Sequence, residues 1–208
     1  MAEFTIYIGN KNYSSWSLRA WLMLKQTGAA FDEELIPIAQ PTSRAEILRY
    51  SPSGKVPTLV HGDVTVWESL AIGEYLAEIF PAAKLWPESP SVRAVARAVS
   101  HEMHAGFMAM RRHFPMNMRS VFDRDIIPEI QGDLDRITAL WRDCRQHYGA
   151  GGDFLFGNSA LPMRCMPPSS AASGPSNCRW KAKPKPMPRR SKLGRPTRNG
   201  RRRPAMNP

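Results

Sequence analysis

Two adjacent hydroxyl side chains, Ser14 and Ser15, lie in the stretch YSSWSLRAW at residues 13–21, where a predicted strand gives way to a predicted helix. Backbone N–H groups at a helix N-terminus have no partner within the helix, and the helix dipole there favours negative charge. A thiolate held beside Ser14 or Ser15 would therefore be stabilised. The simpler interpretation is that a serine is the N-cap of the helix, because serine leads the N-cap preferences.

Two further stretches carry weaker signals of ligand binding. Residues 55–59, KVPTL, place Pro57 inside a strand-like run, which is typical of an edge strand or a cis turn. Residues 67–72, WESLAI, open the next helix with an acid and a hydroxyl, Glu68 and Ser69. The N–H groups of that helix N-terminus are a second place where a carboxylate could bind.

The elements that must position these stretches alternate between strand and helix in residues 1–80. Period-2 patterns predict strands at residues 4–8 and 31–38 and a hairpin turning at residues 61–63. Helical patterns predict helices at residues 16–27, before Gly28, at about 43–50, with Thr42 or Ser43 as the N-cap, and at 68–80. The predicted order is β-α-β-α-β-β-α.

Beyond a proline-rich linker at residues 81–90, the apolar pattern is helical throughout. Apolar residues between positions 92 and 110 predict one long helix that is broken near Pro115, and those between 126 and 141 predict another. Two antiparallel helices bury little apolar surface by themselves. We therefore expect residues 91–158 to be part of an all-helical domain that needs more helices after Gly157.

Charge and proline content change sharply after Asn158. Residues 1–158 carry 16 Lys/Arg and 18 Asp/Glu, whereas residues 159–208 carry 13 Lys/Arg, no acidic residue and 10 of the 19 prolines. The net charge of +11 is thus a property of residues 159–208. Such a composition buries too little apolar surface to offset an ordering entropy of about 1–2 kcal/mol per residue, so we expect this segment to be disordered.

Several protein classes are disfavoured by the remaining features. The start of the chain, MAEFTIYIGNK, lacks the basic and apolar regions of a signal peptide, and no apolar stretch reaches the 18 residues expected of a membrane span. The three cysteines form neither a CxxC nor a metal-binding spacing. We expect a reduced, cytoplasmic protein without a metal site.

In their order and spacing, the serine loop, the VP at residues 56–57 and the ES at residues 68–69 resemble the N-terminal domain of the cytosolic glutathione transferases. The serine-dependent branch, which includes the zeta class and its bacterial relatives, is nearest. The resemblance covers roughly residues 4–158. It implies an α/β thioredoxin-like domain at residues 1–80, an all-α domain that is incomplete here, glutathione as co-substrate, a small electrophilic acceptor and a homodimer.

The resemblance also implies a role for individual residues. Ser14, with Ser15 as the close alternative, would hydrogen-bond the glutathione sulfur and lower the pKa of its thiol. Val56, before a cis Pro57, would pair its backbone with the cysteinyl unit. The other contacts would be Glu68 and Ser69 with the γ-glutamyl end, and Gln40 and Lys55 with the glycyl carboxylate.

One residue of the serine loop departs from the family's pattern. Trp16 stands where the zeta isomerases carry a cysteine, in SSCS. This difference argues against maleylacetoacetate isomerisation and favours general conjugation of the glutathione thiol. Non-catalytic binding of glutathione is an alternative.

A second departure follows Gly157 and Asn158. The family continues there with a helix opened by Ser/Thr-x-x-Asp, and this chain has no such motif. A one-base change of reading frame allows the codons of SALPMRCMPPSS to encode SIADAMYAPVV, which restores the motif. The hypothesis is therefore a frameshift near Asn158. Its alternative is a genuine basic segment that binds nucleic acid, because Lys/Arg runs neutralise phosphates.

Overall fold

The chain forms a four-stranded mixed sheet followed by helices in a computed structural model that describes residues 3–120, 122–158 and 178–181. The strands are β1 (Phe4–Ile8), β2 (Phe31–Leu35), β3 (Thr58–His61), β4 (Val64–Trp67), β5 (Phe122–Asp125) and β6 (Cys178–Lys181). The helices are α1 (Ser15–Thr27), α2 (Ser43–Ile47), α3 (Ser69–Ile79), the 3-10 turn η1 (Pro81–Ala83), α4 (Pro90–Ala105), α5 (Met108–His113) and α6 (Pro128–Tyr148).

The sheet has the strand order β2-β1-β3-β4. Strand β1 pairs in parallel with β2 and antiparallel with β3, and β3 and β4 form the predicted hairpin. Along β1 the side chains of Phe4, Ile6 and Ile8 are buried, while Thr5 and Tyr7 are partly exposed. The period-2 alternation predicted from the sequence therefore corresponds to one buried face of the central strand.

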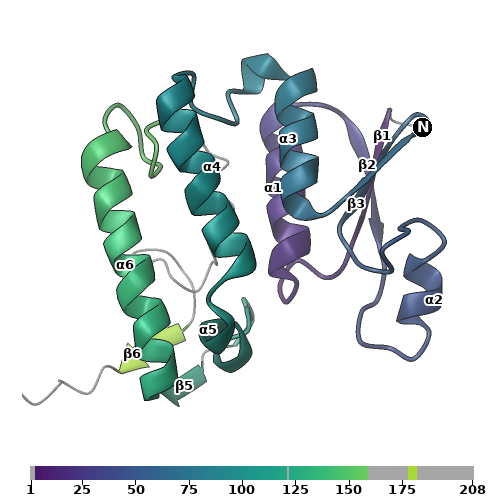
Figure 1. The fold of residues 1–208 in the computed structure, drawn as a ribbon. Helices are drawn as coiled ribbons and strands as arrows, with labels where there is room; N and C mark the ends of the chain where they lie inside the picture. Colours follow the sequence, from purple (N-terminus) through teal and green to yellow (C-terminus); the bar gives the residue numbers. More distant parts are fainter. Residues whose placement is uncertain (1–2, 121, 159–177, 182–208) are drawn as a thin grey trace, which may run out of the picture.

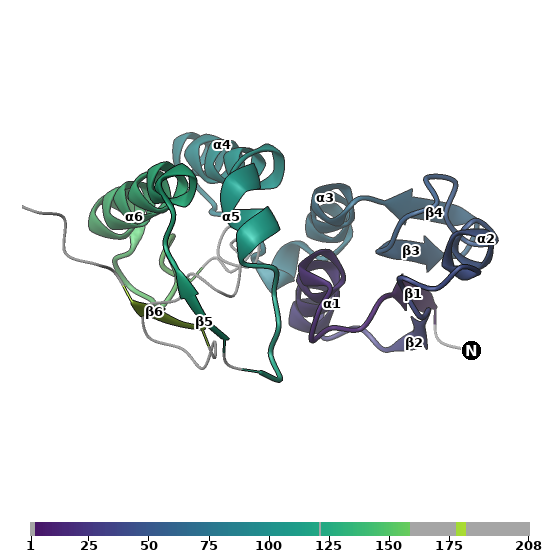
Figure 2. The same cartoon turned by 90° about the horizontal axis from the view of Figure 1, so that it is seen from below.

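Helices α1 and α3 form a layer between the sheet and the later helices, whereas α2 lies on the opposite side of the sheet (Figures 1 and 2). One hydrophobic core extends from β1 through α1 and α3 to α4 and α6. The predicted fold class, an α/β thioredoxin-like domain followed by a helical domain, is confirmed by this arrangement.

Local sequence signals account for the ends of the first helices. Helix α1 begins after the N-cap Ser14 and ends at Gly28, which has a positive φ of 78°. Thr42 precedes α2 as predicted but makes no side-chain capping bond. The neighbouring Ser43 hydroxyl instead donates to the Pro37 carbonyl at 2.7 Å and accepts from the Gln40 N–H at 2.8 Å, which fastens the loop before α2.

The long helix predicted over positions 92–110 is two helices, so the prediction of a single break near Pro115 was wrong. Helix α4 ends at Ala105, and Phe107 adopts a left-handed conformation with φ 62° before α5 begins. A side chain from another helix stabilises the new helix start, because the Asp133 carboxylate of α6 accepts the Met110 N–H at 3.0 Å. Arg111 donates to the carbonyls of Gly106 and Met103 at the break.

Polar contacts tie the helical domain to the thioredoxin-like domain. Arg97 of α4 forms a bidentate ion pair with Glu74 of α3, with both N···O distances at 2.8 Å. The Trp86 indole also donates to Glu74, at 3.0 Å. Burial by itself would raise the pKa of Glu74, but the bonds from Arg97 and Trp86 outweigh it and lower that pKa.

Most of the predicted disordered segment, residues 159–177 and 182–208, lies outside the described residues, as do the further helices expected after Gly157. Residues 178–181 are described as strand β6, which pairs in parallel with β5. The sequence did not predict this pair. Among the residues described, no helix is long and apolar enough to cross a membrane.

Candidate functional site

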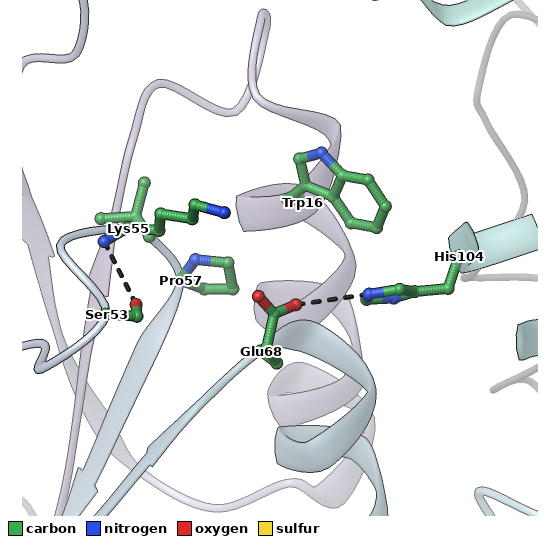
Figure 3. Close-up of a pocket in the computed structure, with 7 residues that line it drawn as sticks. Trp16, Ser53, Lys55, Pro57, Glu68 and His104 are labelled. Carbon is green, nitrogen blue, oxygen red and sulfur yellow. Dashed lines mark hydrogen bonds and ion pairs between the residues drawn. The ribbon is translucent and has the colours of Figure 1, made fainter. Parts of the chain in front are cut away.

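A cavity of about 220 Å³ lies between the loop before β3 and the N-termini of α1 and α3 (Figure 3). We call it the Pro57 cavity. Its lining residues come from both domains and are Trp16, Ser53, Lys55, Val56, Pro57, Glu68 and His104.

The loop that carries Pro57 has the conformation implied by the family resemblance. The Val56-Pro57 peptide bond is cis. The Ser53 hydroxyl accepts the Lys55 N–H at 3.2 Å. This hydrogen bond fixes the backbone just before the cis peptide bond. The loop therefore presents the backbone of Val56 and the side chain of Lys55 on one side of the cavity.

The N-terminus of α3 forms another side of the Pro57 cavity. Glu68 precedes the helix with a positive φ of 72°, a conformation that L-residues rarely adopt. The next residue, Ser69, is 1% exposed, and its hydroxyl oxygen has no hydrogen-bond partner among the described residues. A positive φ at the end of a strand and a buried hydroxyl without a partner are both common where a ligand binds.

A second cavity of about 270 Å³ lies at the N-terminus of α1, and we call it the serine cavity. Ser14 and Ser15 lie on its wall, and α5 and the segment after it form the facing wall. The other lining residues are Tyr13, Trp16, Ile38, Met110, Arg111, Phe114, Pro115 and Met116. Because Trp16 lines both cavities, the serine cavity and the Pro57 cavity are neighbours.

The two serines are in different hydrogen-bonding states. Ser14 is 9% exposed and is the N-cap of α1, because its hydroxyl accepts the Ser17 N–H at 3.3 Å. The same hydroxyl donates to the Ser17 hydroxyl at 2.8 Å. The Ser15 side chain makes no hydrogen bond within the described part of the chain, so its proton is available to a ligand.

The Trp16 ring is surrounded by cationic side chains from both domains. The guanidinium carbons of Arg19 and Arg111 lie 4.3 and 4.8 Å from the centroid of the ring. The imidazole of His104 meets it edge-on, with 4.8 Å between centroids. These contacts fix the indole at the boundary between the two cavities.

His104 of α4 reaches across to the thioredoxin-like domain, as Figure 3 shows, and its Nε2 lies 3.4 Å from Oε2 of Glu68. Burial is the largest cause of a lowered His104 pKa, and the charges of Arg19, His101 and Arg111 lower it further. Glu68 acts in the opposite direction but does not outweigh them.

This lowered pKa predicts a loss of stability in acid. As the pH falls below the ordinary histidine value of 6.5, the unfolded chain takes up a proton that the folded protein resists at His104. The free energy of unfolding should then decrease with falling pH. Urea unfolding near neutral pH and about one pH unit below 6.5 should show a smaller decrease in His104→Gln than in the parent.

His147, an exposed histidine on α6, provides the control for this experiment, because its charge is not among those that act on His104. The His147→Gln variant should keep the pH dependence of the parent. An equal pH dependence in the parent and in His104→Gln would mean that His104 has no part in the acid sensitivity.

The structure brings together most of the residues predicted from the sequence. Lys55, Val56, Pro57 and Glu68 line the Pro57 cavity, Ser69 follows Glu68, and Ser14 and Ser15 line the serine cavity. Gln40 is exposed and lines neither cavity. Ser53, His104 and Arg111 were not predicted, because no local motif marks them.

Two other kinds of reactive site, a metal cluster and a reactive thiol, are not found among the described residues. No group of three or more His, Cys, Asp or Glu side chains there could hold a metal ion. Cys144 is buried in α6, and desolvation raises the pKa of its thiol to about 11. Its thiol is therefore protonated and unreactive near neutral pH.

Comparison with known proteins identifies the domain that holds most of these residues. Residues 13–79 match the sequence model of the family described as "Glutathione S-transferase, N-terminal domain". This part of the chain is therefore similar to the N-terminal domain of the glutathione S-transferases, which confirms the resemblance carried by the serine loop, VP and ES.

Individual relatives agree with this assignment. A probable maleylacetoacetate isomerase of Caenorhabditis elegans is 28% identical over 153 residues, which cover 71% of this chain and 71% of that protein. A dichloromethane dehalogenase of Methylophilus leisingeri is 28% identical over 139 residues, 62% of this chain and 51% of that protein. The chain thus spans only about half of the dehalogenase.

Solved structures extend the similarity to the second domain. A glutathione transferase homolog from Burkholderia, with bound glutathione, is 25% identical with a TM-score of 0.56, and the match covers 79% of this chain and 83% of that chain. A theta class glutathione S-transferase from Xanthomonas axonopodis, also with glutathione bound, is 27% identical with a TM-score of 0.53 and coverages of 78% and 80%.

Proposed function

We propose that this protein is a glutathione transferase that binds glutathione in the Pro57 cavity and activates its thiol for attack on small electrophiles. The observation that carries the proposal is the meeting of two helix N-termini and the cis Pro57 loop around adjoining cavities. The positive ends of α1 and α3 suit the thiolate and the carboxylates of glutathione. Glutathione-bound relatives of similar fold support the choice of ligand.

In this proposal each group around the cavities has one task. The Val56 backbone holds the cysteinyl unit, Glu68 and Ser69 hold the γ-glutamyl end, and Lys55 binds the glycyl carboxylate. Gln40 would join Lys55 only if the loop before α2 moved, because Gln40 lies outside both cavities.

In this proposal the N-terminus of α1 activates the glutathione thiol. A hydroxyl proton from Ser14 or Ser15 is donated to the sulfur, which favours the thiolate and lowers the thiol pKa. The thiol proton passes to solvent. The acceptor is positioned in the serine cavity, so attack occurs between two bound partners.

Binding and turnover together test this proposal. Calorimetric titration of the full chain with glutathione should show saturable binding, and chloronitrobenzene with glutathione should yield the thioether and chloride. Binding without turnover on a panel of electrophiles would support the alternative of a non-catalytic binding protein. Failure to bind glutathione at all would contradict both.

Replacing Ser69 with alanine should separate binding from stability. The variant should raise KM for glutathione about ten-fold, because a hydrogen bond to a charged carboxylate is worth about 1.5–3 kcal/mol. The same change should leave the thermal midpoint unchanged or higher, since it removes a buried hydroxyl that has no partner in the ligand-free protein. Steady-state kinetics and thermal unfolding measure the two effects.

Ser100 of α4 offers a matched control for Ser69. Its hydroxyl is also buried without a partner among the described residues, but it lies within α4 and not at the N-terminus of α3, where Ser69 follows the cavity-lining Glu68. Ser100→Ala should therefore match Ser69→Ala in stability and keep the parental KM. An unchanged KM in Ser69→Ala would remove Ser69 from the glutathione site.

We also propose that the codons after Asn158 are read in a shifted frame. The motif restored by the shift lies where the family places it, and residues 159–208 carry no acidic residue. Sequencing the source DNA across residues 154–165 should find an extra or missing base. If the frame stands, the basic segment is genuine, and salt-sensitive DNA binding that is lost on removing residues 159–208 would support a nucleic-acid partner.

We also propose that the protein is a homodimer located in the cytoplasm. Val64 and Trp67 on β4, the strand at the edge of the sheet, are 45% and 42% exposed, and such apolar side chains suit an interface. Sedimentation equilibrium should give twice the chain mass, and a monomer at micromolar concentration would contradict it.

A further inference from the structure

The serine cavity combines apolar walls with one cation. Tyr13, Trp16 and Phe114 supply aromatic rings, and Met110 and Met116 supply thioethers. Arg111 is the charged residue among the side chains that line it. Flat apolar molecules pack well against such walls, whereas a neutral molecule would leave the charge of Arg111 without a counterion.

The charge of Arg111 is compensated only in part. Its Nε donates to the Gly106 carbonyl at 3.0 Å, and its Nη2 donates to the Met103 carbonyl. One face of its guanidinium covers the Trp16 ring, 4.8 Å from the ring centroid. Burial is the main cause of a lowered pKa of Arg111.

Asp133 is the acidic residue whose charge acts on Arg111, but its carboxylate is already hydrogen-bonded elsewhere. Its carboxylate accepts the Met110 N–H at 3.0 Å, and it makes no ion pair with Arg111 among the described residues. A guanidinium has five N–H donors, of which the two carbonyls occupy two. The Nη1 hydrogens have no partner within the described residues and can bind an anion.

We propose that the serine cavity takes an aromatic or conjugated electrophile that bears an anionic group, with Arg111 binding the anion and the apolar walls holding the ring. This proposal rests on the proposed function and names its acceptor class. A carboxylate on Arg111 would fix the ring near Ser14 and Ser15, where the sulfur reacts. Charge-assisted hydrogen bonds from a fork of N–H donors give such recognition its strength.

The reaction with such an acceptor balances without a further reactant. For a chloronitrobenzoate, the glutathione thiolate attacks the ring carbon that bears chlorine and forms a C–S bond. The C–Cl bond then breaks, and chloride leaves with the bonding electrons. The thiol proton has already passed to solvent, and nothing is oxidised or reduced.

A matched pair of acceptors tests the proposal on the full chain. The chloronitrobenzoate and its neutral carboxamide differ in charge but little in shape. The parent should convert the benzoate with a kcat/KM at least about ten-fold higher, after correction for the rates without enzyme. In Arg111→Gln this preference should disappear while KM for glutathione stays at the parental value.

Arg112, exposed on the same helix, supplies the control variant. Arg112→Gln should keep the preference for the benzoate, and Arg111→Lys should keep part of it. A parent that uses both acceptors equally, or an Arg111→Gln variant that keeps the preference, would overturn the anion site while leaving glutathione transfer intact.

Unreactive ligands keep the test independent of turnover and of variant folding. Calorimetry of the parent with nitrobenzoate and nitrobenzamide should show tighter binding of the anion by about ten-fold, weakened at high salt. Equal affinity for the two would overturn the proposal. Absence of glutathione binding in the same preparation would instead overturn the proposed function on which it rests.

Discussion

Replacing Ser14 and Ser15 together with alanine will lower kcat/KM for glutathione conjugation by about ten- to hundred-fold. The reason is the loss of both serine hydroxyls that the N-terminus of α1 offers to the sulfur. A hydrogen bond to a charged acceptor is worth about 1.5–3 kcal/mol, and each 1.4 kcal/mol is about ten-fold in rate. Steady-state kinetics with a fixed acceptor measures the loss.

The single variants distinguish the donor from the helix cap. Ser14→Ala should also destabilise the protein by about 1 kcal/mol, because Ser14 caps α1 through the Ser17 N–H. Ser15→Ala should leave the free energy of unfolding near that of the parent. The donor to the sulfur is the hydroxyl whose removal lowers kcat/KM even after correction for the fraction of folded protein. Parental kcat/KM in both single variants and in the double variant would refute the assignment.

Replacing Trp16 with alanine will cost both stability and activity. The change removes an indole that packs against Arg19, Arg111 and His104 at the domain boundary. Loss of a packed tryptophan costs about 3 kcal/mol or more when it is buried, and we expect about 2–3 kcal/mol for this partly exposed one. Activity should fall at least about ten-fold, because the wall shared by the two cavities is lost.

Trp21, one and a half turns further along α1, is the control for this variant. It lines neither the Pro57 nor the serine cavity, and its indole donates to Glu33 at 2.6 Å while Lys11 lies over the ring. Trp21→Ala should lower stability but keep kcat per folded molecule. If Trp16→Ala kept the kinetics of the parent, Trp16 would be only a structural residue.

The sequence was informative where local rules decide the structure. The alternation at residues 4–8, the stop at Gly28 and the turn at residues 61–63 all describe short-range preferences, and each appears where it was expected. The break after Ala105 was missed although Gly106, the C-cap of α4, is a local stop signal of the same kind. The contact that local rules could not reveal is with Asp133, 23 residues after Met110, which accepts the Met110 N–H from a separate helix.

The same division holds for the candidate site. Ser14, Pro57 and Glu68 lie in short motifs of the first domain, so local signals marked them and the family resemblance implied their roles. His104 and Arg111 reach the cavities only because α4 and α5 pack against α1, and their own neighbours in the sequence form no motif. The sequence did carry one indirect signal for these two residues. Trp16 stands where the zeta isomerases carry a cysteine, and its large ring is packed by Arg111 and His104 of the second domain.

The ultraviolet absorbance of the glutathione thiolate, followed against pH with saturating protein, tests thiol activation most directly. We predict that bound glutathione titrates at least about one pH unit below free glutathione, and that the Ser14→Ala/Ser15→Ala variant removes most of this difference. A bound thiol that titrates at the same pH as the free one would contradict activation at the N-terminus of α1.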